Sequence, residues 1–462
     1  MNTTNLKIAY IGGGSRGWAW VFMTDLALEP QLSGQISLYD LDGEAAKNNA
    51  IIGNKISEQA AAVGKWTYTA ADSLAEALAG ADFVIISILP GTFREMRSDV
   101  HLPERRGVYQ AVGDTTGPGG IIRALRTIPM FAQIATAIKE HAPEAWVINY
   151  TNPMAWCVRT LYQTFPEIKA FGCCHEVFGT QALLAEMVKR KGLAPADINV
   201  TRNDIHVNVM GINHFTWFDS ASFQGHDLMP MYADFVNENY DTGVTTDTSH
   251  LPDVVFSCTH RVKFDLFRQY GWIAAAGDRH LAEFMPGERY LKSPEMVRAW
   301  GFYLTTVDWR EKDLRDRLAK SKRLLAGEAV ELKPSGEEGI ALIKALCGLG
   351  RVISNVNLPN TAGQLKYIPP ATVVETNALF SYNEVRPLMA GLVKPEVLAL
   401  LMPHISNQET VYDATVSCNR YTVYKAFASD PLLAGRLSAE QIVDLANEMI
   451  ANTRTYLSER WG

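Results

Sequence analysis

Residues 12–17 read GGGSRG and fit the pattern Gly-x-Gly-x-x-Gly directly after an apolar, strand-like segment. In a dinucleotide-binding unit the first glycine, Gly12, permits a tight turn, and the second, Gly14, lets the backbone approach a pyrophosphate. The third, Gly17, permits close packing of the following helix on the strand. A helix that begins near Ser15 would direct its free N–H groups at the phosphates. We therefore predict that the chain begins with a βαβ unit that binds a dinucleotide.

A carboxylate after the second predicted strand indicates which dinucleotide is bound. Asp40 follows the strand-like residues 36–39, about 20 residues after the glycines, where an acidic residue meets the adenosine ribose hydroxyls. A carboxylate at this place repels a 2′-phosphate, so the pattern favours NAD over NADP. Asp42 could take the same role.

The first part of the chain alternates strand-like and helix-like segments, which is typical of a parallel sheet with helices on both faces. We therefore predict the α/β class, with an NAD-binding, Rossmann-like domain over residues 1–195. The predicted strands are residues 7–11, 36–39, 83–88 and 146–150, and the predicted helices are residues 18–28, 44–62 and 121–142.

After about residue 194 the periodicity changes and helical patterns dominate. We predict a second domain over residues 196–462, mixed α+β and largely helical, which serves substrate and metal binding and oligomerisation. Its predicted strands are residues 207–212 and 217–222, its predicted helices are residues 297–318, 339–349, 395–419 and 439–456, and loops rich in Pro, Asn and Gly, such as residues 357–360, connect them.

The composition is that of a soluble globular protein and excludes several partners. The net charge is -7, from 43 Lys and Arg against 50 Asp and Glu, and no basic tract points to nucleic acid or to an anionic membrane. No apolar run approaches the length that crosses a bilayer, and the polar start does not resemble a signal peptide, so we expect a cytoplasmic protein. The 6 cysteines are sparse for this length, and we expect thiols or ligands rather than a disulfide framework.

Four polar motifs follow the glycine loop: one opens the helix predicted from residue 121, and two of the others stand at the ends of predicted strands, where open α/β sheets bind ligands. These motifs are GDTTGPGG at 113–120, NYTNP at 149–153, GCCHE at 172–176 and GINH at 211–214.

Within these motifs, Cys174 and His214 are candidate ligands of a divalent transition metal, because thiolate and imidazole suit such an ion. Spacing alone does not decide this. Cys174 could be a small buried hydrophobic residue, and His214 could be a histidine with satisfied hydrogen bonds. His175 and Glu176 could be acid/base groups, a second ligand, or surface residues.

A further cluster, GDRHLAEF at residues 277–284, holds two carboxylates, a histidine and an arginine. Asp278 and His280 are candidate bases. In a helix, His280 and Glu283 would share a face. Alternatively, Asp278 caps a solvated helix start.

Together these segments resemble glycoside hydrolase family 4, an NAD-dependent exception among the glycosidases. The resemblance covers essentially the whole chain, and the order of five motifs carries it: IGGGSRGW, GDTTGPGG, NYTNP, GCCHE and GINHF. GCCHEVFGT together with GDRHLAEF is most similar to the α-galacturonidase branch. A fold like that of lactate and malate dehydrogenases is implied.

The resemblance also implies roles for individual residues. Cys174 and His214 match the two ligands of a divalent metal, usually Mn²⁺, and Asn152 and Asn213 match residues that hold sugar hydroxyls. His175 stands where some members have an aspartate that assists departure of the leaving group.

The base at sugar C2 is a tyrosine or an aspartate in other branches, and the segment GDRHLAEF offers no tyrosine. Asp278 is therefore the first choice for the base and His280 the second.

The chemistry implied is transient oxidation at sugar C3 by NAD⁺, deprotonation at C2, elimination, water addition and re-reduction, so NAD is recycled. The substrate expected is a glycoside, most simply an α-galacturonide, whose carboxylate suits an arginine. The candidate arginines are Arg94, Arg97, Arg105, Arg106, Arg123 and Arg279.

Other activities fit the same residues less fully. The alternatives are another α-glycosidase of the family (α-glucuronidase or α-galactosidase), a malate-dehydrogenase-type NAD oxidoreductase, and a catalytically silent NAD-binding module. The malate-dehydrogenase-type alternative leaves Cys174 without a role. Long C-terminal helices and 10 tryptophans are compatible with a homo-oligomer, a dimer or a tetramer, although a monomeric core would use them too.

Overall fold

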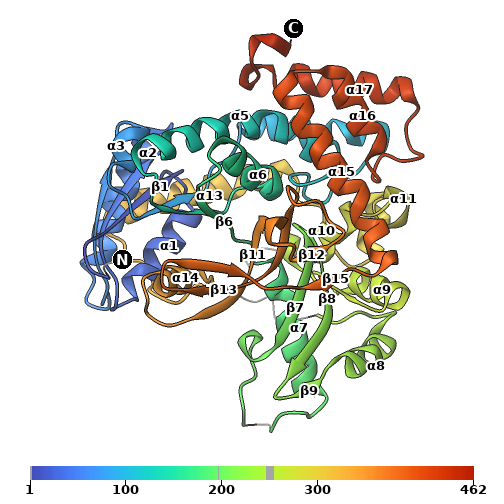
Figure 1. Ribbon diagram of the computed structural model, residues 1–462, viewed down its shortest axis with the longest axis horizontal. Coiled ribbons are helices and arrows are strands. Elements are labelled where there is room, and N and C mark those ends of the chain that lie inside the picture. The colour runs from blue at the N-terminus through green and yellow to red at the C-terminus, as the bar shows by residue number, and fades with distance from the viewer. Residues whose placement is uncertain (1–2, 196, 246–253, 462) are drawn as a thin grey trace.

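The computed structural model describes residues 3–195, 197–245 and 254–461 (Figure 1). Its first part is a parallel sheet in the order β6-β5-β4-β1-β2-β3, which confirms the predicted α/β class. The strands are β1 (Leu6–Ile11), β2 (Ser33–Tyr39), β3 (Lys65–Ala70), β4 (Phe83–Ile86), β5 (Trp146–Asn149) and β6 (Lys169–Gly172). The sequence analysis did not identify β3 and β6.

Helices cover both faces of this sheet, and β4 and β5 are buried along their whole length, as expected of parallel strands between two helical layers. The helices of this part are α1 (Trp18–Ala27), α2 (Gly43–Ser57), α3 (Leu74–Leu78), α4 (Phe93–His101), α5 (Gly117–His141), α6 (Met154–Thr164) and α7 (Glu176–Arg190).

Strands from much later in the chain extend the same sheet. They are β11 (Val352–Pro359), β13 (Val373–Ser381) and β14 (Glu384–Pro387), and they are antiparallel to their neighbours. β11 joins β6 where Asn357 pairs with Gly172. The expected loop at residues 357–360 is therefore largely strand, and the sheet draws on both sides of the predicted boundary at residue 195.

The middle of the chain forms a smaller antiparallel sheet of β7 (His206–Ile212), β8 (Phe215–Phe223), β9 (His226–Asp227) and β10 (Ile273–Ala274). The helices beside it are α8 (Met229–Asn239), α9 (Arg261–Tyr270), α10 (Asp278–Glu283) and α11 (Gly287–Tyr290). The later helices are α12 (Pro294–Ala299), α13 (Val307–Leu325), α14 (Gly339–Leu346), α15 (Pro395–Ser417), α16 (Arg420–Ser429) and α17 (Ala439–Asn452). The helix expected over residues 297–318 is thus two helices, separated by residues 300–306.

α5 is long and apolar enough to span a membrane, which the search for apolar runs in the sequence missed. However, 67% of its most apolar window is buried inside the protein. α15, α16 and α17 pack against it at the upper side of the molecule (Figure 1). α5 is therefore a core helix, and it places the loop before it at the centre of the fold.

Candidate active site

The glycine loop, residues 12–17, is held to the end of β2 by backbone hydrogen bonds. The N–H groups of Gly12 and Gly13 both donate to the Tyr39 carbonyl, at 2.9 Å each. Gly12 has φ of +91°, and a Cβ atom there would lie 2.0 Å from the Ser87 carbonyl oxygen. Only glycine fits this position.

Asp40 belongs to the same arrangement. Its carboxylate accepts hydrogen bonds from the N–H of Gly14 and from the N–H of Asp42, each at 2.9 Å. Asp42, the alternative acid, instead caps α2 by accepting from the N–H of Ala45 at 3.0 Å. The geometry therefore favours Asp40 as the acid beside the glycine loop.

Two details of the loop differ from expectation. α1 begins at Trp18, with Gly17 as its N-cap, so Ser15 precedes the helix. A Cβ atom at Gly17 would lie 2.3 Å from Nη1 of Arg317 in α13, which donates to the Arg16 carbonyl at 3.1 Å. The space above Gly17 is thus occupied by the tip of an α13 side chain, not by β1.

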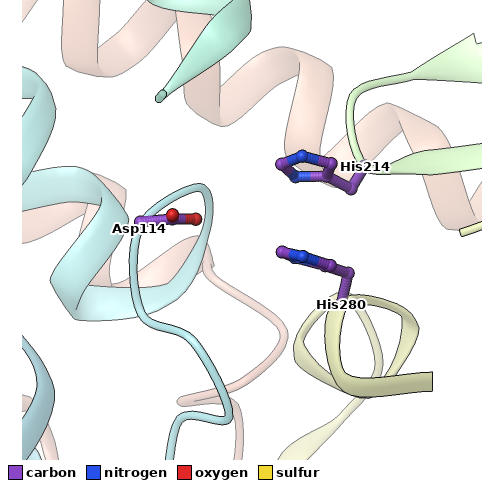
Figure 2. A group of neighbouring side chains, drawn as sticks. All are labelled: Asp114, His214 and His280. Atoms are coloured by element: carbon purple, nitrogen blue, oxygen red, sulfur yellow. The ribbon is translucent and has the colours of Figure 1, made fainter. Parts of the chain in front are cut away.

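A second group of side chains, the histidine cluster, consists of Asp114, His214 and His280, whose donor atoms lie within 4.8 Å of one another (Figure 2). Asp114 lies in the loop before α5, His214 in the turn between β7 and β8, and His280 in α10. The two imidazole rings stack, with centroids 4.1 Å apart, and the Asp114 carboxylate points toward them. A carboxylate and imidazoles at this spacing can bind a divalent metal ion.

The surroundings of His214 favour a neutral imidazole. Its ring is buried, and Nδ1 lies 3.1 Å from the Thr115 hydroxyl. Burial, together with the charge of His280, lowers the pKa of His214 to about 3. A neutral imidazole has a free lone pair, which is the form that binds metals.

The surroundings of His280 are suited to acid/base chemistry. Its Nε2 lies 3.3 Å from a Glu176 carboxylate oxygen, and the other Glu176 oxygen accepts from the N–H of Gly277 at 2.9 Å. Burial lowers the pKa of His280, but the Glu176 carboxylate outweighs burial and raises the pKa above its ordinary value.

Asp278 faces away from this group. Its fully buried carboxylate accepts from the N–H groups of Val262 and Lys263 at 3.2 and 3.3 Å, so it caps the start of α9. Its neighbours there are Cys258 and His260. The geometry therefore favours His280 over Asp278 as the C2 base, which reverses the order taken from the sequence. Asp278 does act as a cap, but for α9 and not for its own helix.

Cys174 is not a member of the histidine cluster. Its thiol lies beside the Asn213 amide, and its carbonyl accepts from Asn355 Nδ2 at 3.1 Å. Burial raises the pKa of the Cys174 thiol well above its usual value. Asn213 directly precedes His214, so the amide beside the Cys174 thiol belongs to the residue next to the other candidate ligand.

His175 is half-exposed at the edge of the site. Its Nδ1 lies 3.3 Å from the Glu337 carboxylate, and its ring lies 5.7 Å from that of Trp18, the first residue of α1. Glu337 also lines a cavity of about 1020 Å³ beside the site, bounded by α7, α14 and β11. His175 can therefore exchange protons with solvent.

Several buried polar atoms around the site have no hydrogen-bond partner among the described residues. They are Asn152 Oδ1, Asn213 Oδ1, His280 Nδ1, Glu283 Oε2, Arg310 Nε and both amide atoms of Asn357. Because buried polar groups are nearly always paired in folded proteins, this concentration indicates a site for a polar ligand.

Of the six candidate arginines, only Arg123 and Arg279 are close to this region. Arg279 donates to the Thr305 hydroxyl at 2.6 Å, and Thr305 N–H donates to Ala111 at 2.8 Å, which brings the start of α13 against the Asp114 loop. The guanidinium of Arg310, in α13, lies near those of Arg123 and Arg279, and burial lowers the pKa of Arg310 to about 10. The remaining four, Arg94, Arg97, Arg105 and Arg106, pair with acidic residues elsewhere.

The sequence analysis missed Asp114 and Arg310, and it missed Glu375, whose buried carboxyl group accepts hydrogen bonds from Asn213 and Asn355. Asp114 lies inside the quoted motif GDTTGPGG, so its place directly before a predicted helix was a usable signal. Arg310 and Glu375 lie in α13 and β13, whose approach to the site depends on distant pairing.

A dinucleotide-binding sheet next to a buried polar site fits a glycosidase that uses NAD. The chain belongs to glycosyl hydrolase family 4. The model of the family 4 glycosyl hydrolases matches residues 7–190, and the model of their C-terminal domain matches residues 209–433.

Individual relatives agree with this assignment. The chain is 59% identical over 462 residues to an α-galacturonidase of Lachnoclostridium phytofermentans, covering 99% of this chain and 98% of that protein. It is 51% identical to an α-galacturonidase of Bacillus subtilis, covering 96% and 97%. The crystal structure of the lplD protein from Bacillus subtilis matches with a TM-score of 0.90 at 49% identity, covering 96% of this chain and 100% of that chain.

Proposed function

We propose that this protein is an NAD- and Mn²⁺-dependent α-galacturonidase. The observation that carries the proposal is the identity of more than half of all residues, over nearly the whole chain, to proteins named α-galacturonidase. The three guanidinium groups of Arg123, Arg279 and Arg310 near the site support a substrate that bears a carboxylate.

The residues present fit both cofactors. The glycine loop and Asp40 would hold NAD, through Gly12, Gly14, Ser15 and Gly17. His214 would hold Mn²⁺ with Asp114 beside it, and Cys174, whose thiol lies beside the Asn213 amide, would supply a thiolate, since imidazole, carboxylate and thiolate suit this ion. When bound, NAD⁺ supplies reversible oxidation at sugar C3, and Mn²⁺ supplies polarisation of the C2 and C3 oxygens.

The chain's own residues would hold the sugar and move its protons. Asn152 and Asn213 offer amide oxygens that have no partner in the described part of the chain and that would accept hydrogen bonds from sugar hydroxyls. His280 accepts the proton from C2, and the Glu176 carboxylate stabilises the imidazolium that forms. His175, beside Glu337, delivers a proton to the leaving oxygen.

A comparison of nitrophenyl α-galacturonide, α-glucuronide and α-galactoside tests the proposal, with NAD⁺, Mn²⁺ and a thiol reductant present. We expect release from the galacturonide, dependence on both cofactors, and no accumulation of NADH. Deuterium at C2 should slow the reaction. Full activity after chelation, or steady formation of NADH from a hydroxy acid, would reject the proposal. Preference for either other glycoside would move the assignment within the family.

The proposal extends to the setting of the enzyme. We infer a cytoplasmic protein, because a thiolate ligand is kept reduced in that compartment and the 6 cysteines are free thiols. The long C-terminal helices and the 10 tryptophans are compatible with a homo-oligomer, and we propose a dimer or a tetramer. Light scattering of the purified protein measures the oligomeric state.

A further inference from the structure

Glu375 of β13 lies at the centre of a buried group of amides that no motif of the sequence singles out. Its side chain is 1% exposed. One carboxylate oxygen accepts from Asn355 Nδ2 at 2.7 Å, and the other accepts from Asn213 Nδ2 at 3.1 Å. Asn355 Nδ2 also donates to the Cys174 carbonyl at 3.1 Å. One carboxylate therefore connects the residue before His214 with the backbone of Cys174.

Strand register places this carboxylate between the two candidate metal ligands. Asn357 of β11 pairs with Gly172 of β6 on one side and with Glu375 of β13 on the other. Gly172 ends β6 just before Cys174, and Asn213 follows β7 just before His214. β11 and β13 thus bring Glu375 to the place where the two ligand segments meet.

The carboxylate also determines which way the amides face. The two carboxyl oxygens of Glu375 accept both hydrogen bonds, so both asparagines turn Nδ2 toward this side chain. The Oδ1 atom of Asn213 is left buried and without a partner among the described residues. Burying a carboxyl group in this place costs stability that an apolar side chain of similar size would not, which indicates a functional reason for it.

We propose that Glu375 is a positioning residue, which orients Asn213 toward the sugar and holds the Cys174 and His214 segments at the spacing that Mn²⁺ binding requires. Glu375 touches neither the sugar nor the ion in this scheme. The inference rests on the proposed function, because it assumes that Cys174 and His214 bind Mn²⁺.

The test is Mn²⁺ binding to the full-length protein, followed by the electron paramagnetic resonance signal of free Mn²⁺. In Glu375→Gln one carboxylate oxygen becomes an NH₂ group, which confronts an asparagine donor with another donor. We expect Mn²⁺ affinity to fall by about 10–100-fold, as for other groups that orient metal ligands. NAD⁺ affinity should stay unchanged, and the KM for the galacturonide should rise because Asn213 loses its orientation.

Thr376→Val is the matched control. Thr376 is the next residue of β13, its side chain faces the opposite side of the sheet, and its hydroxyl has no hydrogen-bond partner among the described residues. We expect its Mn²⁺ affinity to equal that of the unchanged protein. Glu375→Asp, which keeps two acceptors on a shorter stem, should bind Mn²⁺ with intermediate affinity.

The outcomes separate the inference from the proposed function. If the unchanged protein binds no Mn²⁺, the proposed function fails. If it binds Mn²⁺ and Glu375→Gln binds equally well, the inference alone is overturned. Should Glu375→Gln not fold, Asn355→Ser decides, since it removes the connection from Glu375 through Asn355 to the Cys174 carbonyl and leaves the hydrogen bond between Glu375 and Asn213. Weaker Mn²⁺ binding supports the inference, and unchanged binding refutes it.

Discussion

The glycine loop and the histidine cluster use opposite means to prepare for a ligand. The glycine loop is made of backbone: Gly12, Gly13 and Gly14 place their N–H groups against Tyr39 and Asp40, close by in sequence. The histidine cluster is made of charged and polar side chains from the loop before α5, the β7–β8 turn and α10. One region requires the absence of side chains, and the other requires particular side chains.

This difference predicts different kinds of failure. A substitution in the glycine loop acts by steric strain and should affect NAD⁺ alone. A substitution in the histidine cluster changes a proton or a charge and should affect turnover or metal binding while NAD⁺ still binds. Measuring NAD⁺ affinity, Mn²⁺ affinity and turnover for each variant tests whether the regions are separable.

The largest effect is expected at His280. His280→Gln removes the base, and turnover of the galacturonide should fall by about 10²–10⁴-fold, the usual contribution of a general base. NAD⁺ affinity should not change. Steady-state kinetics and a fluorescence titration with NAD⁺ measure the two quantities.

Asp278→Asn is the comparison for His280→Gln. It weakens the cap of α9 and leaves the buried Lys263 without its charge partner, so the melting temperature should fall more than the turnover of the folded protein. A folded Asp278→Asn enzyme without turnover, beside an active His280→Gln enzyme, would return the base to Asp278.

Gly12→Ala should produce the next largest effect. The added Cβ would lie 2.0 Å from the Ser87 carbonyl oxygen at a φ of +91°, so the loop must shift. NAD⁺ affinity should fall by about 100-fold, while Mn²⁺ affinity stays within about twofold. Gly43→Ala is the control, since nothing lies within 4 Å of its added Cβ. Equal losses of NAD⁺ and Mn²⁺ binding would show that the two regions are coupled.

The same contrast explains what could be predicted from the sequence. Gly12, Gly14 and Asp40 were predictable because their contacts lie within one βαβ unit. The spacing of these residues along the sequence is therefore enough to identify them. The end of β11, residues 357–359, resembled a loop because Asn and Pro are disfavoured in strands. Its asparagines serve the site, and only the pairing with β6 reveals this.

The histidine cluster was only partly predictable. His214 and His280 were candidates because each belongs to a polar motif at the end of an element. The choice between Asp278 and His280 depended on the position of the start of α9, whose N–H groups bind the Asp278 carboxylate. The spacing of residues within α10 gives no information on that position. Glu375 depended on strand pairing across some 200 residues of sequence, for which the chain offers no local pattern.

A smaller effect is expected from Arg310→Met, which removes a guanidinium with an unpartnered Nε at the site. The kcat/KM for the galacturonide should fall by about 10–100-fold, as for loss of one charged hydrogen bond, and that for the galactoside should not fall. Arg97→Met is the control. Arg97 lies in α4 and pairs at the surface with Asp308, which belongs to α13, the helix of Arg310. Parallel losses on both sugars would assign Arg310 a structural role.

The smallest effect expected is a change of stability with pH at Glu283, beside the histidine cluster. Burial raises the pKa of Glu283 to about 7. A raised pKa means that the stabilisation is complete below the ordinary value of 4.5 and is lost as pH rises through about 7. Glu283→Gln keeps the oxygen that accepts from Val112 and Gly113 at 2.8 and 2.9 Å, and it cannot ionise. Its melting temperature should therefore gain on that of the unchanged protein between pH 5.5 and pH 8.5, by roughly a few degrees. A constant difference across this range would mean that the Glu283 carboxylate titrates near its ordinary pKa and that its surroundings are wetter than its burial indicates.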